Sequence, residues 1–360
     1  MENPYYVGLM SGTSLDGIDA ILVQFSKAPS CKIIATHFHK IPKLIREQIL
    51  SLTMNPTCSL IQIGTLNTEL GSLFADSVLS LLKKASVTPS QIKAIGSHGQ
   101  TLWHAPNQAY PFSWQIGNPA VIAARTKIMT IADFRSNDVA CGGQGAPFAP
   151  AFHQWLFQDK NQNRFIVNIG GISNITVLTT HSDDVIGYDT GPGNALLDAW
   201  CQKNRNLPFD QDGQWASQGK CDETLLEKLL ADPYFQRLPP KSTGKEFFNL
   251  AWLAQYLKER TYQPEDVQAT LVALTAQCIV SGLLSYSNKG CVYLCGGGTH
   301  NEALVSKIRE RLPPSFTLDS TEPLGLDPDW VEAACFAWLA KQRAQQQPIN
   351  LCAITGSKHP

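Results

Sequence analysis

Residues 6–23 read YVGLMSGTSLDGIDAILV, two apolar runs of β-forming residues on either side of a turn made of Gly, Ser, Thr and Asp. Glycine lets backbone N–H groups approach an anion closely, and the hydroxyl groups of Ser11, Thr13 and Ser14 add donors. The pattern predicts a β-hairpin whose turn binds phosphate, with Asp16 or Asp19 holding a metal ion through water. Because most Gly- and Asp-rich turns are only turns, recurrence of the pattern is what favours a binding role.

The pattern recurs twice. Residues 165–178 read FIVNIGGISNITVL, again an apolar run, a small polar turn and a β-branched run. Residues 292–301 read VYLCGGGTHN, an apolar strand that ends in three glycines, where backbone without side chains can lie flat against a nucleotide. We therefore predict two related halves that form a split nucleotide-binding clamp.

Size and composition indicate a globular protein with two α/β domains. The chain has 360 residues, of which 43% are hydrophobic and 16% charged, and its net charge is −1. No basic field favours nucleic acid or a membrane surface as a partner. The N-terminus lacks the pattern of a signal peptide, and none of the ten cysteines forms a C-x-x-C pair, so we expect a cytoplasmic protein with reduced thiols.

Further along the chain, hydrophobic spacing predicts an amphipathic helix over 60–85 and short strands at 94–97 and 128–131. Alternating strands and helices favour a mostly parallel sheet, with ligands beyond the carboxyl ends of its strands. The uncharged stretch 267–288 is long enough to span a bilayer, but its polar residues favour a core helix behind the strand at 291–295. A last helix is expected over 330–345, capped by a carboxylate from Asp327 or Asp329.

The domain organisation follows from composition. The glycine- and proline-rich passage at 141–150 predicts the crossing between domains. We expect an N-terminal lobe over 1–140, joined by the C-terminal helix at about 330–346. The second lobe, 141–329, is expected to bind nucleotide and to carry a helical insertion at about 205–250.

Asp189 is the predicted catalytic residue. It lies in IGYDTGPGN, residues 186–194, where the Asp follows an apolar strand and directly precedes a glycine-rich turn. Such a carboxylate can accept a proton from an attacking oxygen, while the N–H groups of 190–194 and the following helix attract phosphate. The alternative is that Asp189 merely caps the helix beginning near Ala195.

Six motifs in order resemble the anhydro-N-acetylmuramic acid kinases, members of the actin, Hsp70 and sugar-kinase superfamily. These motifs are residues 8–19, 97–101, 142–147, 168–174, 189–194 and 296–298. The resemblance covers essentially the whole chain. It implies an α/β, two-domain ribonuclease H-like fold of the actin and hexokinase type, with mixed central sheets and an interdomain cleft.

The resemblance also implies a reaction. An ATP-dependent kinase of peptidoglycan recycling would open the 1,6-anhydro ring of anhydro-N-acetylmuramic acid and phosphorylate O6, with Mg²⁺ bridging the phosphates and a homodimer as the assembly. Asp189 matches the catalytic base and Glu332 a carboxylate that helps to hold the sugar. ATP would contact Gly12, Thr13, Ser14, Leu15, Asp16, Gly17, Ile18, Asp19, Asn168, Gly170, Gly171, Gly191, Gly193, Asn194, Gly296, Gly297 and Gly298.

The remaining sugar ligands are predicted from chemistry. A lactoyl carboxylate requires a cation, which Arg135 or His98 can supply at strand ends. Gln100 and Asn168 offer amides suited to sugar hydroxyls. Each has an ordinary structural alternative: His98 as a hydrogen-bonded strand-end residue, and Glu332 as part of a charged first helical turn.

Three other functions fit parts of the sequence. A kinase for another sugar shares the fold, since fold does not determine substrate. An ATP-driven conformational switch shares the clamp, although no additional peptide-binding domain is evident. A hydrolase using Ser11 or Ser97 beside His98 lacks the G-x-S-x-G turn.

Overall fold

The computed structural model describes residues 4–12, 14–26, 29–180, 185–258 and 260–359. The chain forms two compact units, Met1–Leu156 with Trp330–Pro360, and Phe157–Asp329. The division falls after Leu156, whereas the sequence placed it after residue 140. The passage at 141–150 lies inside the first unit, where residues 141 and 144 form backbone hydrogen bonds with residues 358 and 355.

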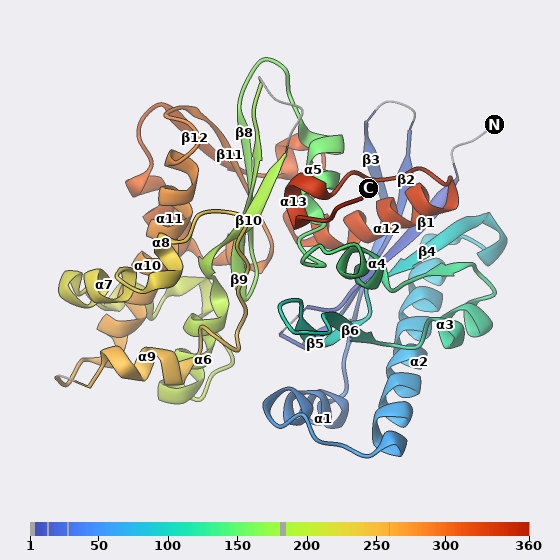
Figure 1. Cartoon of the computed structure of the whole chain (residues 1–360), viewed down its shortest axis with the longest axis horizontal. Coiled ribbons are helices and arrows are strands. Elements are labelled where there is room, and N and C mark those ends of the chain that lie inside the picture. Colours follow the sequence, from blue (N-terminus) through green and yellow to red (C-terminus); the bar gives the residue numbers. More distant parts are fainter. Residues whose placement is uncertain (1–3, 13, 27–28, 181–184, 259, 360) are drawn as a thin grey trace. The chain divides into compact units, whose positions relative to one another are not determined.

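The first unit contains a five-stranded sheet with the order β3-β2-β1-β4-β7 (Figure 1). Its strands are β1 (Tyr5–Met10), β2 (Gly17–Phe25), β3 (Cys31–Lys40), β4 (Ile92–Ser97) and β7 (Thr130–Ile131). The pairs β1–β2 and β2–β3 are antiparallel, and the pairs β1–β4 and β4–β7 are parallel. The sheet is therefore mixed rather than mostly parallel, because two tight hairpins precede the first crossover helix. A separate hairpin consists of β5 (Gln100–Ala105) and β6 (Phe112–Ile116).

Helices cover both faces of this sheet. The helices of the unit are α1 (Lys43–Met54), α2 (Leu60–Ala85), α3 (Pro119–Thr126), α4 (Phe134–Ala140), α5 (Ala149–Phe157), α12 (Val331–Ala344) and α13 (Cys352–Thr355). Val7 and Leu9 share a core with the apolar stripe of α2, whereas a side chain at Gly8, which points to the other face, would meet α12. The predicted helix over 60–85 is confirmed, with the Ser59 side chain as N-cap and Lys83 and Lys84 in its last turn.

The second unit repeats the topology. Its sheet has the order β10-β9-β8-β11-β12, again with two antiparallel pairs followed by two parallel pairs. The strands are β8 (Arg164–Ile169), β9 (Ile172–Leu178), β10 (Ile186–Pro192), β11 (Gly290–Cys295) and β12 (Phe316–Ser320). The two related halves predicted from the repeated hairpins are thus confirmed.

The core of the second unit is built around α10 (Pro264–Leu284), which contacts α6 (Asn194–Arg205), α7 (Glu223–Leu230) and α11 (Glu302–Arg311). The helices α8 (Pro233–Gln236) and α9 (Leu250–Tyr256) contribute residues to the same core. Among the described residues, α10 is the one helix long and apolar enough to cross a membrane, and 78% of its apolar window is buried. It is a core helix, as predicted; it packs against β9 and β10, and Val292 and Leu294 of β11 belong to the same core.

The predicted cap of the last helix is wrong. The N-cap of α12 is Trp330, and no side chain caps it. Asp329 instead contacts Nε2 of His300 at 2.9 Å, and Asp327 accepts a hydrogen bond from the backbone N–H of Asp329. A 3-10 turn at Pro328–Trp330 precedes α12.

Glycines hold α12 against the sheet, which generates a stability test. A Cβ at Gly8 would overlap the backbone carbonyl of Ala333, so Gly8→Ala should lower the free energy of unfolding by about 3 kcal/mol. Gly64 on α2 is exposed and has no atom within 4 Å of an added Cβ, so Gly64→Ala should raise that free energy by about 0.5–1 kcal/mol. Urea unfolding measures both, and equal effects of the two variants would contradict the packing argument.

Candidate active site

The turn of the first hairpin and the start of the next strand contain both buried and exposed residues. Leu15 and Ile18 are fully buried in the core, so these two residues of the predicted ATP segment can face a ligand only through their backbone. Ser14 and Asp16 are exposed, and the Ser14 hydroxyl donates to Oδ1 of Asp16 at 2.5 Å. Gly17, Ile18 and Asp19 belong to β2, and Thr13 lies outside the described residues.

A buried hydrogen bond ties this turn to the predicted sugar residues. The Ser11 hydroxyl lies 2.7 Å from Oε1 of Gln100 and 3.1 Å from the carbonyl of Gly17, and donates toward both. Ser11 and Gln100 are almost completely buried. Gln100 therefore fixes the base of the turn, a role that its sequence position did not reveal.

His98 and Arg135 form one unit. Nε2 of His98 accepts hydrogen bonds from Nη2 of Arg135 at 2.9 Å and from Nε at 3.2 Å. Burial, with a further contribution from the Arg135 cation, lowers the pKa of His98 well below its ordinary value. His98 is thus neutral and orients the guanidinium, so Arg135 is the cation of this pair.

The helix α12 brings the fourth predicted sugar residue to this cluster. Glu332 lies in its first turn, and one turn later the ring of Phe336 packs at 4.7 Å from the ring of His98. Burial raises the pKa of the Cys335 thiol, which the charge of Glu332 raises further and that of Arg135 lowers. Glu332 and Arg135 thus both lie near the buried Cys335, and the first unit contains all four predicted sugar residues, His98, Gln100, Arg135 and Glu332.

In the second unit, the glycine turns at 168–171 and 191–194 pack directly on each other. The N–H of Asn194 donates to the carbonyl of Gly170 at 2.8 Å, and those of Gly193 and Ala195 donate to Gly171 at 3.0 Å. These three N–H groups donate to backbone carbonyls in this structure, and their role in binding phosphate stays a prediction. The physical role of Gly193 is close approach, since a Cβ there would overlap the Gly170 carbonyl.

The triple glycine turn lies against the same strand end. A Cβ at Gly296, whose φ is +80°, would overlap Oδ1 of Asn168, and one at Gly298 would overlap the side chain of Ile169. Gly297 has no atom within 4 Å of an added Cβ. Oδ1 of Asn168 is buried without a hydrogen-bond partner. This open backbone and unsatisfied amide oxygen fit a ligand that lies flat and donates a hydrogen bond.

Asp189 lies within β10, half-buried, and does not cap the following helix. Oδ2 of Asp189 accepts a hydrogen bond from the N–H of Thr243 at 2.9 Å, whereas the N-cap of α6 is Gly193. The backbone of Asp189 is held as well: its N–H donates to the carbonyl of Lys241, and its carbonyl accepts from the Tyr234 hydroxyl at 2.7 Å. A clamp of Tyr234, Lys241 and Thr243 thus orients the predicted base.

The sequence does not reveal this clamp, because its members follow Asp189 by about 50 residues, inside the segment expected to be an insertion. Burial, and next the charge of Asp189, raises the pKa of Tyr234, which keeps its hydroxyl protonated and able to donate. The ammonium of Lys241 lies 4.9 Å from the centre of the Tyr234 ring. Burial lowers the pKa of Lys241, and the Asp189 carboxylate is one of the groups opposing that shift. The sequence signal, a lysine after two prolines, is too common to be informative.

The described residues offer little for a tightly held metal ion. No group of three or more His, Cys, Asp or Glu side chains within them is arranged to bind one. Asp16 is a single exposed carboxylate beside a hydroxyl. This fits Mg²⁺, which keeps several waters and takes its other ligands from substrate phosphates.

The hydrolase alternative fails on geometry. A nucleophilic serine needs a hydrogen bond to its base. Ser11 donates to Gln100 and Gly17 instead, the buried hydroxyl of Ser97 has no hydrogen-bond partner, and Nε2 of His98 is occupied by Arg135. No Ser–His pair forms among these residues.

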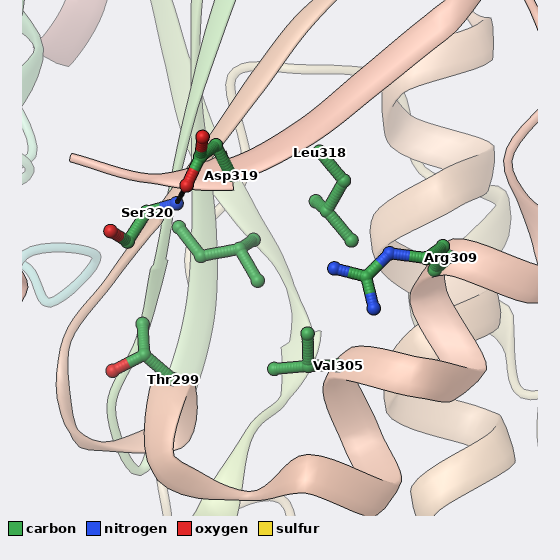
Figure 2. Close-up of a pocket in the computed structure, with 7 residues that line it drawn as sticks. Thr299, Val305, Arg309, Leu318, Asp319 and Ser320 are labelled. Carbon is green, nitrogen blue, oxygen red and sulfur yellow. Dashed lines mark hydrogen bonds between the residues drawn. The ribbon is translucent and has the colours of Figure 1, made fainter. Parts of the chain in front are cut away.

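One cavity of about 110 Å³ lies in the second unit beside the end of β11 (Figure 2). Its lining residues are Leu294, Thr299, Val305, Arg309, Leu318, Asp319 and Ser320. The Thr299 hydroxyl donates to the carbonyl of Gly296 at 2.8 Å, so the cavity borders the triple glycine turn. None of the predicted site residues lines it.

Comparison with known proteins gives a consistent result. A model of the anhydro-N-acetylmuramic acid kinase family matches residues 4–360. A protein of that name from Coxiella burnetii (strain Dugway 5J108-111) is 49% identical over 360 residues, covering 99% of this chain and 96% of the relative. One from Shewanella baltica (strain OS185) is 48% identical over 358 residues, with the same coverage.

Solved structures resemble the chain more distantly. Component A of (R)-2-hydroxyglutaryl-CoA dehydratase from Acidaminococcus fermentans has a TM-score of 0.49 and 11% identity, covering 95% of this chain and 99% of that one. A ROK family glucokinase from Streptomyces griseus has a TM-score of 0.42 and 13% identity, covering 94% and 99%.

The His98–Arg135 pair generates a pH prediction. A free imidazole titrates near pH 6.5, but the pKa of His98 should lie well below that value because burial and the Arg135 cation oppose its charged form. The unfolded chain binds this proton at about pH 6.5, so the stability that His98 contributes is fully present above that pH and falls as the pH drops. NMR of the histidine rings measures the titration, and a His98 midpoint near 6.5 would contradict the assignment.

Proposed function

The chain belongs to the family of anhydro-N-acetylmuramic acid kinases, and we propose that Asp189 is the general base of its reaction. The enzyme is an ATP-dependent kinase that hydrolytically opens the 1,6-anhydro ring of 1,6-anhydro-N-acetylmuramic acid and phosphorylates O6, giving N-acetylmuramic acid 6-phosphate and ADP. The observation that supports the role of Asp189 is the hydrogen bond from Thr243, which holds one carboxylate oxygen in a defined direction.

The chemistry requires a base. In a 1,6-anhydro sugar O6 is part of the acetal bridge to C1, so no O6 hydroxyl is present to attack ATP. Water attacks C1 and loses a proton to the Asp189 carboxylate, the C1–O6 bond breaks, and O6 attacks the γ-phosphorus as ADP leaves. A single carboxylate thereby couples hydrolysis to phosphoryl transfer.

The clamp explains how this chain prepares the carboxylate. A general base must lie within hydrogen-bond reach of the proton that it removes, and a rotating carboxylate meets this condition only part of the time. The Thr243 N–H restricts that rotation, and the bonds to Tyr234 and Lys241 hold the backbone of the same residue. We assign these three residues to orienting Asp189.

For the sugar, we propose that Arg135 binds the lactoyl carboxylate. Its guanidinium is oriented by neutral His98, and a planar guanidinium matches a carboxylate through two parallel hydrogen bonds. Glu332 supplies an acceptor for sugar hydroxyls from the first turn of α12. Gln100 supports the turn at 11–16 through Ser11.

For ATP, we propose that Gly12 to Asp19 and the glycines of the second unit supply backbone contacts. Added Cβ atoms at Gly12, Gly170 and Gly297 would meet nothing closer than 3.7 Å, so the bare backbone at these positions can receive phosphate or nucleotide. Mg²⁺ held through water by Asp16 would neutralise charge on the phosphates. We further propose a cytoplasmic homodimer, which light scattering tests through the mass in solution.

Two alternative functions can be tested by product assays. A kinase for another sugar would phosphorylate ordinary N-acetylmuramic acid or a different hydroxylated substrate at least as well as the anhydro sugar. An ATP-driven switch would hydrolyse ATP without forming a sugar phosphate. Measuring both products side by side separates these functions.

Asp189→Asn should lower kcat by about 10²- to 10⁴-fold, because the amide cannot accept the proton of water. ATP binding and the unfolding midpoint should be preserved, since the amide oxygen can still accept from Thr243. The matched control is Asp212→Asn, the same isosteric change in the same unit at a position bonded to Gln211. Near-normal turnover by Asp189→Asn would refute the catalytic role.

The order of bond making predicts the position of an isotope. In water enriched in oxygen-18, the product formed from the anhydro sugar and ATP should carry one heavy oxygen at C1 and none in its phosphate group. Mass spectrometry of the product and of its fragments measures both positions. A heavy oxygen in the phosphate would contradict attack of water at C1.

A further inference from the structure

The C-terminal segment 351–359 is attached to the glycine loop 141–145 of the first unit. The hydroxyl of Thr355 donates to Oδ1 of Asp138 at 2.6 Å, and both side chains are at least 95% buried. The carbonyl of Thr355 accepts from the N–H of Gln144 at 2.8 Å, and the N–H of Lys358 donates to the carbonyl of Cys141 at 2.9 Å. Residues more than 200 positions apart are thus joined by three hydrogen bonds.

Asp138 also accepts hydrogen bonds from the glycine loop, so the C-terminal segment constrains the loop through Asp138. Its Oδ2 accepts from the N–H of Gly145 at 2.7 Å, and its backbone carbonyl accepts from the N–H of Gly143 at 2.8 Å. Gly145 has a φ of +69°, and a Cβ at Gly143 would overlap the Asp138 carboxylate. The loop therefore has little freedom once Asp138 is fixed, and Thr355 is a donor that fixes it.

The loop in turn holds Arg135. The carbonyl of Gly145 accepts a hydrogen bond from Nη1 of Arg135 at 2.6 Å, on the side of the guanidinium that His98 does not contact. The guanidinium also lies 5.4 Å from the centre of the Phe148 ring, just beyond the loop. Two supports, His98 and the Gly145 carbonyl, therefore set the direction of its remaining N–H bonds.

We propose that Thr355 is a positioning residue for substrate recognition, acting through Asp138 and Gly145 on the Arg135 guanidinium. The inference rests on the proposed function, in which Arg135 binds the carboxylate of the sugar. A guanidinium must meet a carboxylate with the correct distance and plane for both hydrogen bonds to form, so a small displacement loses much of the interaction. The C-terminal segment thus determines affinity for the sugar.

The test is a comparison of KM with kcat. Thr355→Val removes the hydroxyl at constant shape and should raise KM for the anhydro sugar by about tenfold, with kcat and KM for ATP changing less than about twofold. Thr355→Ser retains the hydroxyl and should restore the wild-type KM. The control is Thr126→Val, a buried threonine of the same unit whose hydroxyl donates within α3. Asp138→Asn replaces one carboxylate oxygen by an NH₂ group, so Thr355 and Gly145 can no longer both donate to residue 138; it should reproduce the effect and replaces Thr355→Val if that variant does not fold.

A second arm separates this proposal from the function on which it depends. With 1,6-anhydro-N-acetylglucosamine, which lacks the lactoyl carboxylate, Thr355→Val should match the wild type. In an Arg135→Ala background, Thr355→Val should add no further increase in KM for the anhydro-muramic sugar. If Arg135→Ala leaves that KM unchanged, the role proposed for Arg135 is wrong. If Arg135→Ala raises it but neither Thr355→Val nor Asp138→Asn does, the positioning role of Thr355 is overturned.

Discussion

The backbone of α12 lies directly on the sheet of the first unit, and this contact depends on two positions without side chains. Gly8 in β1 faces the carbonyl of Ala333, and Gly96 in β4 faces that of Phe336. Any side chain at these points would lift the helix, because close-packed interiors cannot absorb an extra methyl group without displacement. The same helix packs Phe336 against the ring of His98 and carries Glu332 in its first turn, so its packing adds Glu332 to the unit that holds the other predicted sugar residues.

The glycines of the predicted ATP-binding turns have two different physical roles. At Gly193, Gly296 and Gly298 the missing side chain lets neighbouring chain segments touch, and the N–H groups of Gly193 and Asn194 are already hydrogen-bonded. At Gly12, Gly170 and Gly297 the space in front of the backbone is open. Three positions therefore build the turns and three leave room for a ligand, although all six look alike in the sequence.

Polar side chains that were expected to contact substrate also form hydrogen bonds with other groups of the protein. His98 is buried and neutral, and its contribution is to orient Arg135. Gln100 is paired with Ser11, and Asp189 is paired with Thr243. A charged or amide group that must act in one direction needs a second partner, and these partners come from distant parts of the chain.

The sequence by itself determined the local elements and the repeated architecture. The spacing of apolar residues predicts the helix over 60–85 to the residue, and the two hairpins predict the two related sheets, because both patterns depend on neighbours within a few positions. The sequence singled out Asp189 by its motif, Glu332 by the family resemblance and Arg135 by its charge at a strand end, and their roles stay predictions. Only the tertiary structure decided their partners: Thr243 for Asp189, Gly145 and His98 for Arg135, and the link from Thr355 to Asp138. These contacts join residues 10 to 217 positions apart, and the longer ones form only when packing brings distant segments together, which no local pattern records.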